Sequence, residues 1–587
     1  MGANKVTDFG LKMYEDKYFL PGETYDDLVK RVCDFNSLDE EHSKRLQEYW
    51  KKLWFHPATP ITANSGTNRG HVISCFLNEV KDSKGGIFSG YDENFWLGAG
   101  GGGIGTDWSS VREVGASVGT NGKSSGIIPF LKVSDSATLA VSQGGLRRAS
   151  QAVYLNVDHP EIEEFIDLRR PTGADANRRC LNIHHGVKLD DEFMTAVFNR
   201  DRWNLISPAT GNVVKDVDAF DLFKKILLSR VETGEPYIFF SDNALEQQPT
   251  VYDEAGLEVS MSNLCTEIML PTSPDRTAVC CLSSLNLETY DEWQDHPEFI
   301  YDVVAFLDKV LSNFIEMASG ELGYEKAVAS AKDERSIGLG VMGLAGLMQS
   351  MGVPWESAIA TSLNRKIFRH IREKVDLATE ELAIRLGAAP IYDRVNSEGK
   401  PRRNVCAISI APTSSISILC GESTAGVDPI LTNVYTHKNN VGSHVVRNKH
   451  LVAVIDTFAR EKHLKGDWVE AQWKSIIQHE GSVQHLEWMD EWTKEVFKTA
   501  YEINQLWIIE GAATRQEFID QGQSVNLFFA HDSHVAEIYN THFSAWSKGL
   551  KSLYYCRSTT SNRAKVGHKV ERDIIKEQNY EECLSCQ

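Results

Sequence analysis

Short apolar segments and amphipathic segments alternate between residues 125 and 290, and this alternation limits the folds that the chain can adopt. Segments 151–156, 180–187 and 236–240 are short and rich in residues that favour strands. Between them, 218–231 places Phe220, Phe223, Ile226 and Leu227 on one face of a helix. Strands that alternate with helices favour a largely parallel sheet or barrel with the helices outside.

Outside this stretch, helical and extended segments do not alternate regularly along the chain. The first 55 residues are predicted to be helical, and residues 38–54 carry apolar side chains at helical spacing before Pro57 ends the helix. After residue 555 the pattern stops and the chain becomes polar and irregular, which is typical of a mobile tail. We therefore predict a helical region at 1–55, an α/β body at 56–555 and a flexible tail at 556–587. Further helices are expected at 355–386 and 448–511, and strands at 72–77, 262–270, 404–410, 415–419 and 524–530.

A glycine-rich stretch at 98–105 contains a literal GxGxxG pattern. A dinucleotide-binding fingerprint requires a strand before this pattern and a helix after it, and neither is evident here. Close packing of backbone near a site explains these glycines better.

Charge and cysteine content exclude several functional classes. A formal net charge of −20 argues against a nucleic-acid-binding surface, which must be basic. No run of about 18 apolar residues predicts a membrane span, and no secretory leader is recognisable at the N-terminus. We expect a cytoplasmic protein. Among eleven cysteines only Cys583 and Cys586 have the spacing of a zinc-binding pair, so no metal site is expected in this chain.

Ser262–Leu270 contains an unusual set of polar residues in an apolar context. As a buried strand, this segment would point Asn263, Cys265 and Glu267 toward the same side, because side chains alternate between faces. A thiol flanked by an amide and a carboxylate is a reactive combination. Taken alone, the segment is better explained as a buried structural cysteine beside a hydrogen-bonded glutamate, and the reactive interpretation depends on residues elsewhere in the chain.

Residues far apart in the sequence complete a recognisable constellation. The constellation consists of Cys75, Cys265 and Cys280, the adjacent tyrosines Tyr554 and Tyr555, and a C-terminal Cys-Leu-Ser-Cys. This combination resembles the large, catalytic subunit of ribonucleotide reductase, most closely class I, from about Pro57 to the last residue. The motifs that carry the resemblance are Ala58-Thr59-Pro60-Ile61, Ser74-Cys75, Gly119-Thr120-Asn121-Gly122, Gln143-Gly144-Gly145, Asn263-Leu264-Cys265-Thr266-Glu267, Leu282-Ser283-Ser284-Leu285-Asn286-Leu287, Ala411-Pro412-Thr413 and Leu550-Lys551-Ser552-Leu553-Tyr554-Tyr555.

The resemblance implies a ten-stranded α/β barrel and reduction of ribonucleotides, expected to be diphosphates, by radical chemistry. Cys265 would become a thiyl radical that abstracts the 3′-hydrogen of the sugar. Glu267 matches the base that takes the 3′-hydroxyl proton, and Asn263 matches a hydrogen-bonding amide. Cys75 and Cys280 match the pair that supplies two electrons and closes into a disulfide.

Two further features concern the thiols. Cys280, rather than its neighbour Cys281, has the matching spacing to Leu282, and adjacent strand residues face opposite sides. The resemblance implies that Cys583 and Cys586 reopen the disulfide and are themselves reduced by a thioredoxin- or glutaredoxin-type protein. The 28 residues from Tyr555 to Cys583 have a reach of roughly 30 Å.

Tyr554 and Tyr555 match the pair that relays a radical from a separate small subunit, which would hold the metallocofactor. Some motifs, such as Tyr18–Thr24 and Ala411–Thr413, are instead similar to class II enzymes. Two alternatives therefore stay open: a class II reductase that uses adenosylcobalamin, and a catalytically inactive nucleotide-sensing scaffold.

The resemblance also implies binding residues for substrate and for an allosteric effector. The expected effector is a deoxynucleoside triphosphate or ATP, and the effector-bound enzyme is expected to be a homodimer. Only some 55 residues precede the barrel motifs, so no N-terminal ATP-cone is expected. Substrate-binding candidates are Thr59, Ser74, Thr413, Ser414 and Ser415, and effector-binding candidates are Asp82, Ser83, Arg112, Arg147 and Arg148.

Overall fold

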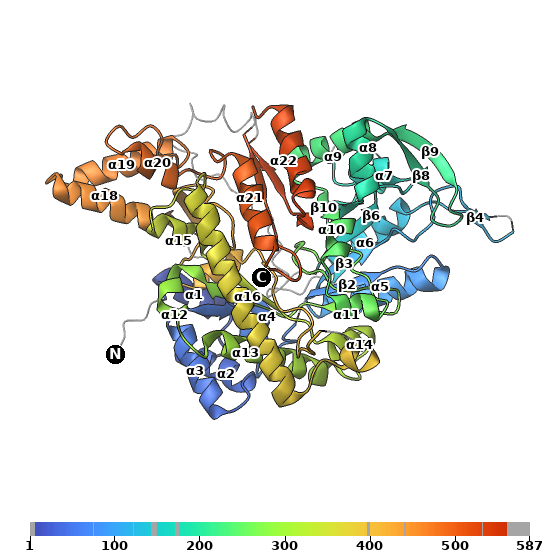
Figure 1. The fold of residues 1–587 in the computed structure, drawn as a ribbon, viewed down its shortest axis with the longest axis horizontal. Coiled ribbons are helices and arrows are strands. Elements are labelled where there is room, and N and C mark those ends of the chain that lie inside the picture. The colour runs from blue at the N-terminus through green and yellow to red at the C-terminus, as the bar shows by residue number, and fades with distance from the viewer. Residues whose placement is uncertain are drawn as a thin grey trace.

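The computed structural model describes residues 6–73, 75–120, 122–141, 149–170, 175–395, 399–439, 442–530 and 532–559. Its N-terminal helices are α1 (Asp8–Lys17), α2 (Tyr25–Phe35) and α3 (Glu40–Lys51), drawn in blue in Figure 1. Thr24 and Asp27 form a capping box that starts α2. Leu46, Tyr49 and Trp50 belong to the buried face of α3. The predicted N-terminal helical segment is confirmed.

A seven-stranded sheet forms one side of the molecule. Neighbouring strands β2, β3, β6, β7 and β10 are parallel, and β11 and β17 flank them in antiparallel orientation. Helices between the parallel strands cover the outside of the sheet, as the alternating pattern predicts (Figure 1). The strand order is β11 (Ala278–Val279), β2 (Cys75–Glu79), β3 (Gly103–Asp107), β6 (Ser150–Asn156), β7 (His184–Leu189), β10 (Tyr237–Phe240) and β17 (Ser552–Leu553).

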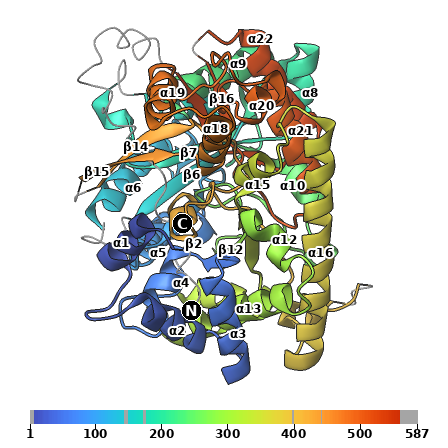
Figure 2. The same ribbon diagram turned by 90° about the vertical axis from the view of Figure 1, so that its left-hand side faces the viewer.

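A second sheet forms the other side. It contains β1 (Phe55–Pro57), β12 (Leu282–Asn286) and β13 (Gly338–Met342). Isolated parallel bridges continue it from Leu339 to Ile408 and from Ile410 to Gln523. Helices α13 (Phe299–Ala318) and α16 (Ala358–Leu386) lie outside it, and α16 runs along one edge of the molecule (Figure 2).

The last described residues join the two sides. Strand β17 pairs with β10 of the first sheet, whereas β18 (Cys556–Ser558) pairs with β16 (Leu527–Phe529) on the other side. Only Tyr554 and Tyr555 separate β17 from β18. The predicted α/β barrel is confirmed, and the tyrosine pair lies where its two halves meet.

The remaining elements connect the strands or form surface modules. They are α4 (Thr59–Asn64), α5 (Lys84–Ala99), β4 (Ser117–Val118), β5 (Gly122–Lys123), α6 (Ile128–Ala140), α7 (Ile162–Ile166), η1 (Ala176–Arg178), α8 (Asp191–Asn199), β8 (Arg202–Ile206), β9 (Val213–Asp218), α9 (Ala219–Thr233), α10 (Ser241–Glu246), α11 (Thr250–Glu254), η2 (Leu287–Thr289), α12 (Tyr290–Trp293), α14 (Glu325–Glu334), α15 (Leu344–Ser350), η3 (Pro390–Arg394), α17 (Ser414–Leu419), β14 (Val434–Asn439), β15 (Gly442–Arg447), α18 (Lys449–Glu461), α19 (Gly466–Gln478), α20 (Glu491–Val496), α21 (Gln505–Gln516) and α22 (Val535–Ser547).

Three predicted strands are wrong. Residues 262–270 form a loop, because the Asn263 side chain accepts backbone hydrogen bonds that close a turn. Residues 415–419 belong to helix α17, which begins after Thr413 adopts a left-handed conformation with φ 57°. Residues 404–410 make only isolated bridges. In the first two segments local turn geometry overrides the strand-like composition, and in the third the pairing is too short to form a regular strand.

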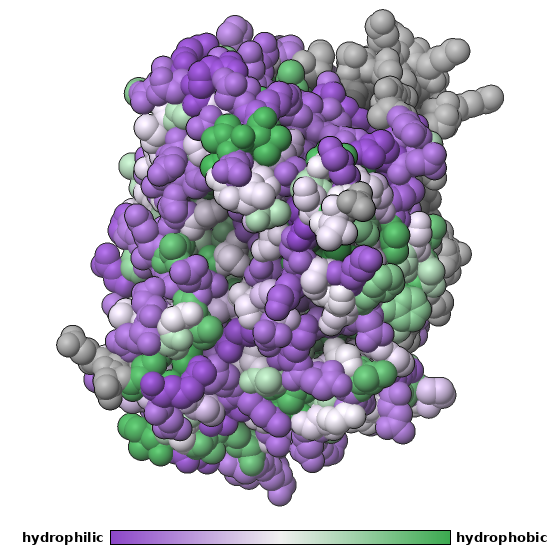
Figure 3. Space-filling view, turned by 90° about the vertical axis from the view of Figure 1, so that its right-hand side faces the viewer, coloured by the Kyte–Doolittle hydropathy of each residue, from purple (hydrophilic) through white to green (hydrophobic). Residues whose placement is uncertain are grey.

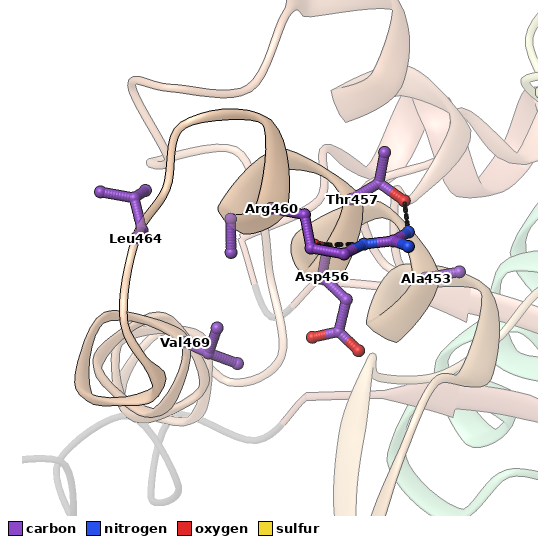
Figure 4. Close-up of a pocket in the computed structure, with 7 residues that line it drawn as sticks. Ala453, Asp456, Thr457, Arg460, Leu464 and Val469 are labelled. Carbon is purple, nitrogen blue, oxygen red and sulfur yellow. Dashed lines mark hydrogen bonds between the residues drawn. The ribbon is translucent and has the colours of Figure 1, made fainter.

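A peripheral module projects at the upper left of Figure 1 and contains α18, α19 and α20. It has its own hydrophobic cluster, which includes Leu451, Trp473 and Phe497. An open cavity of about 570 Å³ lies between α18 and α19. There Arg460 donates to the backbone oxygen of Asp456 and to the hydroxyl of Thr457 (Figure 4). In the part of the chain that the structure describes, no helix combines the length and apolar character needed to cross a membrane.

Candidate active site

The loop that carries Asn263, Cys265 and Glu267 packs against the inner face of the seven-stranded sheet. Gly105 lies at the centre of β3, where an added Cβ would stand 2.5 Å from the backbone oxygen of Ser262. From β6, Tyr154 donates a hydrogen bond of 2.7 Å to the backbone oxygen of Asn263. The glycine-rich stretch thus provides the predicted close approach of backbone.

Asn263 organises both the loop and two distant cysteines. Its side-chain oxygen accepts from the backbone N–H groups of Glu267 and Ile268, each at 3.0 Å. Its Nδ2 lies 3.3 Å from the sulfur of Cys75 and 4.0 Å from that of Cys280. These two cysteines are neighbours, since the N–H of Cys280 donates to the backbone oxygen of Cys75 at 3.0 Å. One buried amide therefore contacts both sulfurs.

Cys265 is fully buried at the turn of the loop. The Tyr554 hydroxyl lies 3.5 Å from its sulfur. Ser524 donates to the backbone oxygen of Cys265 at 2.5 Å and lies 3.5 Å from Oε2 of Glu267. From β17, Ser552 donates to the backbone oxygen of Thr266, which has a left-handed φ of 66°. Contacts from both sides of the barrel thus hold the unusual turn.

Tyr554 and Tyr555 form a compact aromatic pair. Their ring centroids are 4.2 Å apart at an interplanar angle of 49°, and both side chains are buried. The Arg557 guanidinium lies over the ring of Tyr555, 4.9 Å from its centroid. Tyr554 contacts Cys265 directly, so the pair extends from the sulfur toward the junction of the barrel halves.

Cys280 and Cys281 have different surroundings. Cys280 is near the Asn263 amide, whereas the Cys281 sulfur lies 3.4 Å from the backbone oxygen of Leu307 on α13. Burial raises the pKa of the Cys281 thiol well above its ordinary value. The two neighbours therefore point to opposite sides of the strand-like segment, and only Cys280 faces the site.

The described substrate-binding candidates lie at two helix starts. Thr59 begins α4, and its hydroxyl lies 3.2 Å from that of Tyr18. Thr413 precedes α17 and accepts from the N–H of Gly426 at 2.7 Å, while Ser414 and Ser415 are the first residues of that helix. The remaining candidate, Ser74, lies outside the described residues.

Three effector-binding candidates are close together. Nε and Nη2 of Arg112 are both 2.8 Å from Oδ2 of Asp82. Ser83 caps α5, because its hydroxyl accepts from the N–H of Gly86 at 2.9 Å. Arg147, Arg148, Cys583 and Cys586 fall outside the residues that the structure describes.

Sequence reasoning missed Tyr154, Ser524 and Ser552, which support the loop. It also missed Tyr237, whose ring contacts both tyrosines of the pair. No spacing rule could have identified them, because each lies far along the chain from the group that it contacts. Among the described residues, no three His, Cys, Asp or Glu side chains are grouped as metal ligands.

Comparisons with known proteins identify similar chains across nearly the whole length. The family model "Ribonucleotide reductase, barrel domain" matches residues 73–402 and 394–556, and "Ribonucleotide reductase, all-alpha domain" matches residues 4–70. A putative ribonucleoside-diphosphate reductase large subunit of Frog virus 3 (isolate Goorha) is 38% identical, covering 96% of this chain and 95% of the relative. The ribonucleoside-diphosphate reductase large subunit of Invertebrate iridescent virus 3 is 35% identical, covering 94% of each. The solved structure of an Actinobacillus ureae class Id ribonucleotide reductase alpha subunit matches with a TM-score of 0.83 and 32% identity, covering 95% of this chain and 98% of that one.

Proposed function

The chain belongs to the ribonucleotide reductase large-subunit family, class I, and from this premise we propose that it reduces ribonucleoside diphosphates by thiyl-radical chemistry at Cys265. The observation that carries the proposal is the 3.5 Å distance between the Tyr554 hydroxyl and the Cys265 sulfur. A buried thiol can pass a hydrogen atom to the phenoxyl radical of an adjacent tyrosine without any movement of the backbone.

The chemistry needs a radical because the C–H bonds of ribose are unactivated and hydroxide is a poor leaving group. The Cys265 thiyl radical takes the 3′-hydrogen, and Glu267 accepts the 3′-hydroxyl proton. The 2′-hydroxyl then leaves as water. Cys75 and Cys280 supply two electrons and two protons and become a disulfide. Glu267 returns its proton to the 3′-oxygen, and the 3′-hydrogen returns from Cys265. The Asn263 amide, which contacts both sulfurs, supports this assignment.

Radical supply requires a second protein. A small subunit with a metallocofactor oxidises Tyr555, which then takes a hydrogen atom from Tyr554. Tyr554 in turn takes the hydrogen atom of the Cys265 thiol, so each step regenerates one phenol. The ring separation of 4.2 Å within the pair supports short transfers.

Each turnover leaves a disulfide that thiolate exchange must reopen. Cys583 and Cys586 perform this exchange, and a thioredoxin- or glutaredoxin-type protein restores their thiols. The number of residues after Tyr555 gives the tail a reach of roughly 30 Å, which is enough to visit both the buried disulfide and the external reducing protein.

Substrate phosphates bind at the start of α17. The first N–H groups of a helix lack partners within the helix and attract anions. Ser414 and Ser415 add hydroxyls at this position, and Thr413 sets the direction of the chain through its bond to Gly426. Thr59 contributes a further hydroxyl from α4.

Effector binding and dimerisation both involve helix α5. Asp82 and Ser83 precede α5, and Arg112 is paired with Asp82, so a nucleotide effector has charged and polar partners there. The adjacent helices expose large apolar side chains, and green patches interrupt the hydrophilic surface on this side of the molecule (Figure 3). A second copy of the chain covers this face in the effector-bound homodimer. The exposed apolar side chains are Phe88, Phe95 and Trp96 on α5 and Val133 and Leu139 on α6.

The test is to assay deoxyribonucleotide formation by the pure chain with ribonucleoside diphosphate, effector and dithiol. Product should form only when the small subunit is added, and Cys265→Ser should abolish it. Product formed with adenosylcobalamin in place of the small subunit would refute the tyrosine relay. No product under either condition would indicate a nucleotide-sensing scaffold.

A further inference from the structure

A third tyrosine lies against the pair. Tyr237, on β10, is fully buried. Its ring centroid is 4.8 Å from that of Tyr554 and 5.2 Å from that of Tyr555, and the latter contact is edge-to-face at 86°. The three rings therefore form one cluster in which Tyr237 contacts both members of the proposed relay.

The Tyr237 hydroxyl is unusual for a buried polar group. It makes no hydrogen bond of good geometry with a described residue, although nearly all buried polar groups in proteins are satisfied. Burial raises the pKa of Tyr237 well above its ordinary value, and the neighbouring phenol of Tyr555 raises it further. Tyr237 therefore keeps its proton and remains a hydrogen-bond donor throughout the physiological pH range.

Backbone contacts hold Tyr237 beside Tyr554. Strands β10 and β17 are antiparallel, with Ile238 opposite Leu553. The buried Arg230 side chain adds a clamp: it donates to the backbone oxygen of Pro236 and, at 3.0 Å, to that of Tyr554. The residues next to Tyr237 and Tyr554 cannot separate without breaking these bonds.

A charged network encloses the other side of Tyr237. The His184 ring stacks on that of Tyr237, with centroids 6.0 Å apart at 18°. Glu235 accepts from His184 Nδ1 at 2.6 Å and pairs with Arg169 at 3.3 Å. Because its neighbours are fixed, the Tyr237 ring has one defined orientation toward the pair.

We propose that Tyr237 is a positioning residue of the radical relay, whose hydroxyl donates a hydrogen bond to the Tyr555 oxygen when Tyr555 has lost its hydrogen atom. The bond holds the Tyr555 radical in the orientation from which it takes the hydrogen atom of Tyr554. Tyr237 itself gains and loses no electron. This inference rests on the proposed function, because it requires a radical that enters through Tyr555.

The experiment uses Tyr237→Phe in the complete enzyme with small subunit, substrate and effector. The variant keeps the ring and removes only the hydroxyl. Loss of one hydrogen bond along the relay should reduce the turnover number about tenfold while the KM for the nucleotide stays unchanged. With 3-aminotyrosine installed at position 554 or 555, electron paramagnetic resonance should show a lower radical yield at 554 and an unchanged yield at 555.

Two controls separate positioning from a packing defect. Tyr290→Phe removes another buried hydroxyl, which lies 3.1 Å from His370, and should leave turnover unchanged. Installing 3-fluorotyrosine at position 237 restores the hydroxyl and should recover activity. Unchanged turnover in Tyr237→Phe, or an equal fall in radical yield at both positions, would overturn the inference. Absence of both aminotyrosine radicals in the otherwise unaltered chain would refute the relay itself.

Discussion

The hydroxyl oxygen of Tyr554 lies 3.5 Å from the sulfur of Cys265, although 289 positions separate the two residues in the sequence. The contact joins the segment that closes the barrel to the loop inside it. It places an oxidisable phenol in direct contact with a thiol that is fully buried.

Tyr554→Phe should abolish product formation while the fold is retained. Phenylalanine fills the same space but has no hydroxyl through which a hydrogen atom can move to or from Cys265. Turnover with the small subunit present should fall to the background of the assay, and the thermal unfolding midpoint should change little. Product formation at more than a tenth of the parent rate would contradict the relay.

Cys280→Ser and Cys281→Ser should have opposite consequences. Cys280 faces the Asn263 amide and Cys75, whereas Cys281 contacts the backbone of α13. In multiple-turnover assays with dithiol, Cys280→Ser should reduce product to background, and Cys281→Ser should retain most of the activity. The reverse result would assign the redox pair to Cys75 and Cys281.

Gly105→Ala should displace the loop that carries Asn263 and Cys265, because β3 packs against that loop at Gly105. The added methyl group would lie 2.5 Å from the Ser262 backbone oxygen and 3.1 Å from Cα of Asn263, and neither backbone atom can easily move. We expect a loss of about 1–3 kcal/mol in the free energy of unfolding together with a large loss of turnover. Gly85→Ala is the matched control, because no atom lies within 4 Å of its added Cβ. Equal behaviour of the two variants in urea unfolding and activity assays would contradict the packing argument.

Stability should decrease in mild acid because of His56. This side chain is fully buried, and burial lowers its pKa from 6.5 to about 4. Above pH 6.5 the ring is neutral in both folded and unfolded chains. Between pH 6.5 and 4 only the unfolded chain binds the proton, so the free energy of unfolding falls as pH decreases, by about 1.4 kcal/mol per pH unit from this group.

Urea unfolding of the parent and of His56→Gln at pH 7.5, 6.5, 5.5 and 4.5 measures this dependence. His56→Gln should be less stable at pH 7.5, because it loses the 2.6 Å contact with the Tyr14 hydroxyl, but its pH dependence should be shallower. Parallel slopes for the two proteins would assign the acid sensitivity to other groups.

Phe95→Glu should weaken the homodimer. Phe95 is 49% exposed on α5, the helix that the effector-binding candidate Ser83 caps, and burying a carboxylate at an apolar interface is unfavourable. In sedimentation velocity with saturating effector, the variant should remain largely monomeric. Leu377→Glu places the same charge on an exposed apolar position of α16 and should dimerise like the parent. Equal association of all three proteins would place the interface elsewhere.

The sequence alone identified the α/β alternation, the N-terminal helical segment and the family, since these depend on local periodicity and on motifs that can be recognised in order. It also identified Asn263, Cys265, Glu267, Cys75 and Cys280 as a group. It was wrong about the segment that carries three of them, because strand-like composition does not reveal that the Asn263 side chain will accept the N–H groups of Glu267 and Ile268. Side-chain hydrogen bonding of this kind competes with the ladder of a sheet.

Which distant residues support the site depends on how the barrel closes. The contacts of Ser524, Ser552 and Tyr154 with the loop, and of Tyr237 with the tyrosine pair, follow from closure of the barrel and not from any spacing in the sequence. Strand pairing brings β10 beside β17, and this pairing juxtaposes side chains that are separated by hundreds of residues. Local patterns determine which elements form, whereas burial of their apolar faces against one another determines which polar groups meet inside.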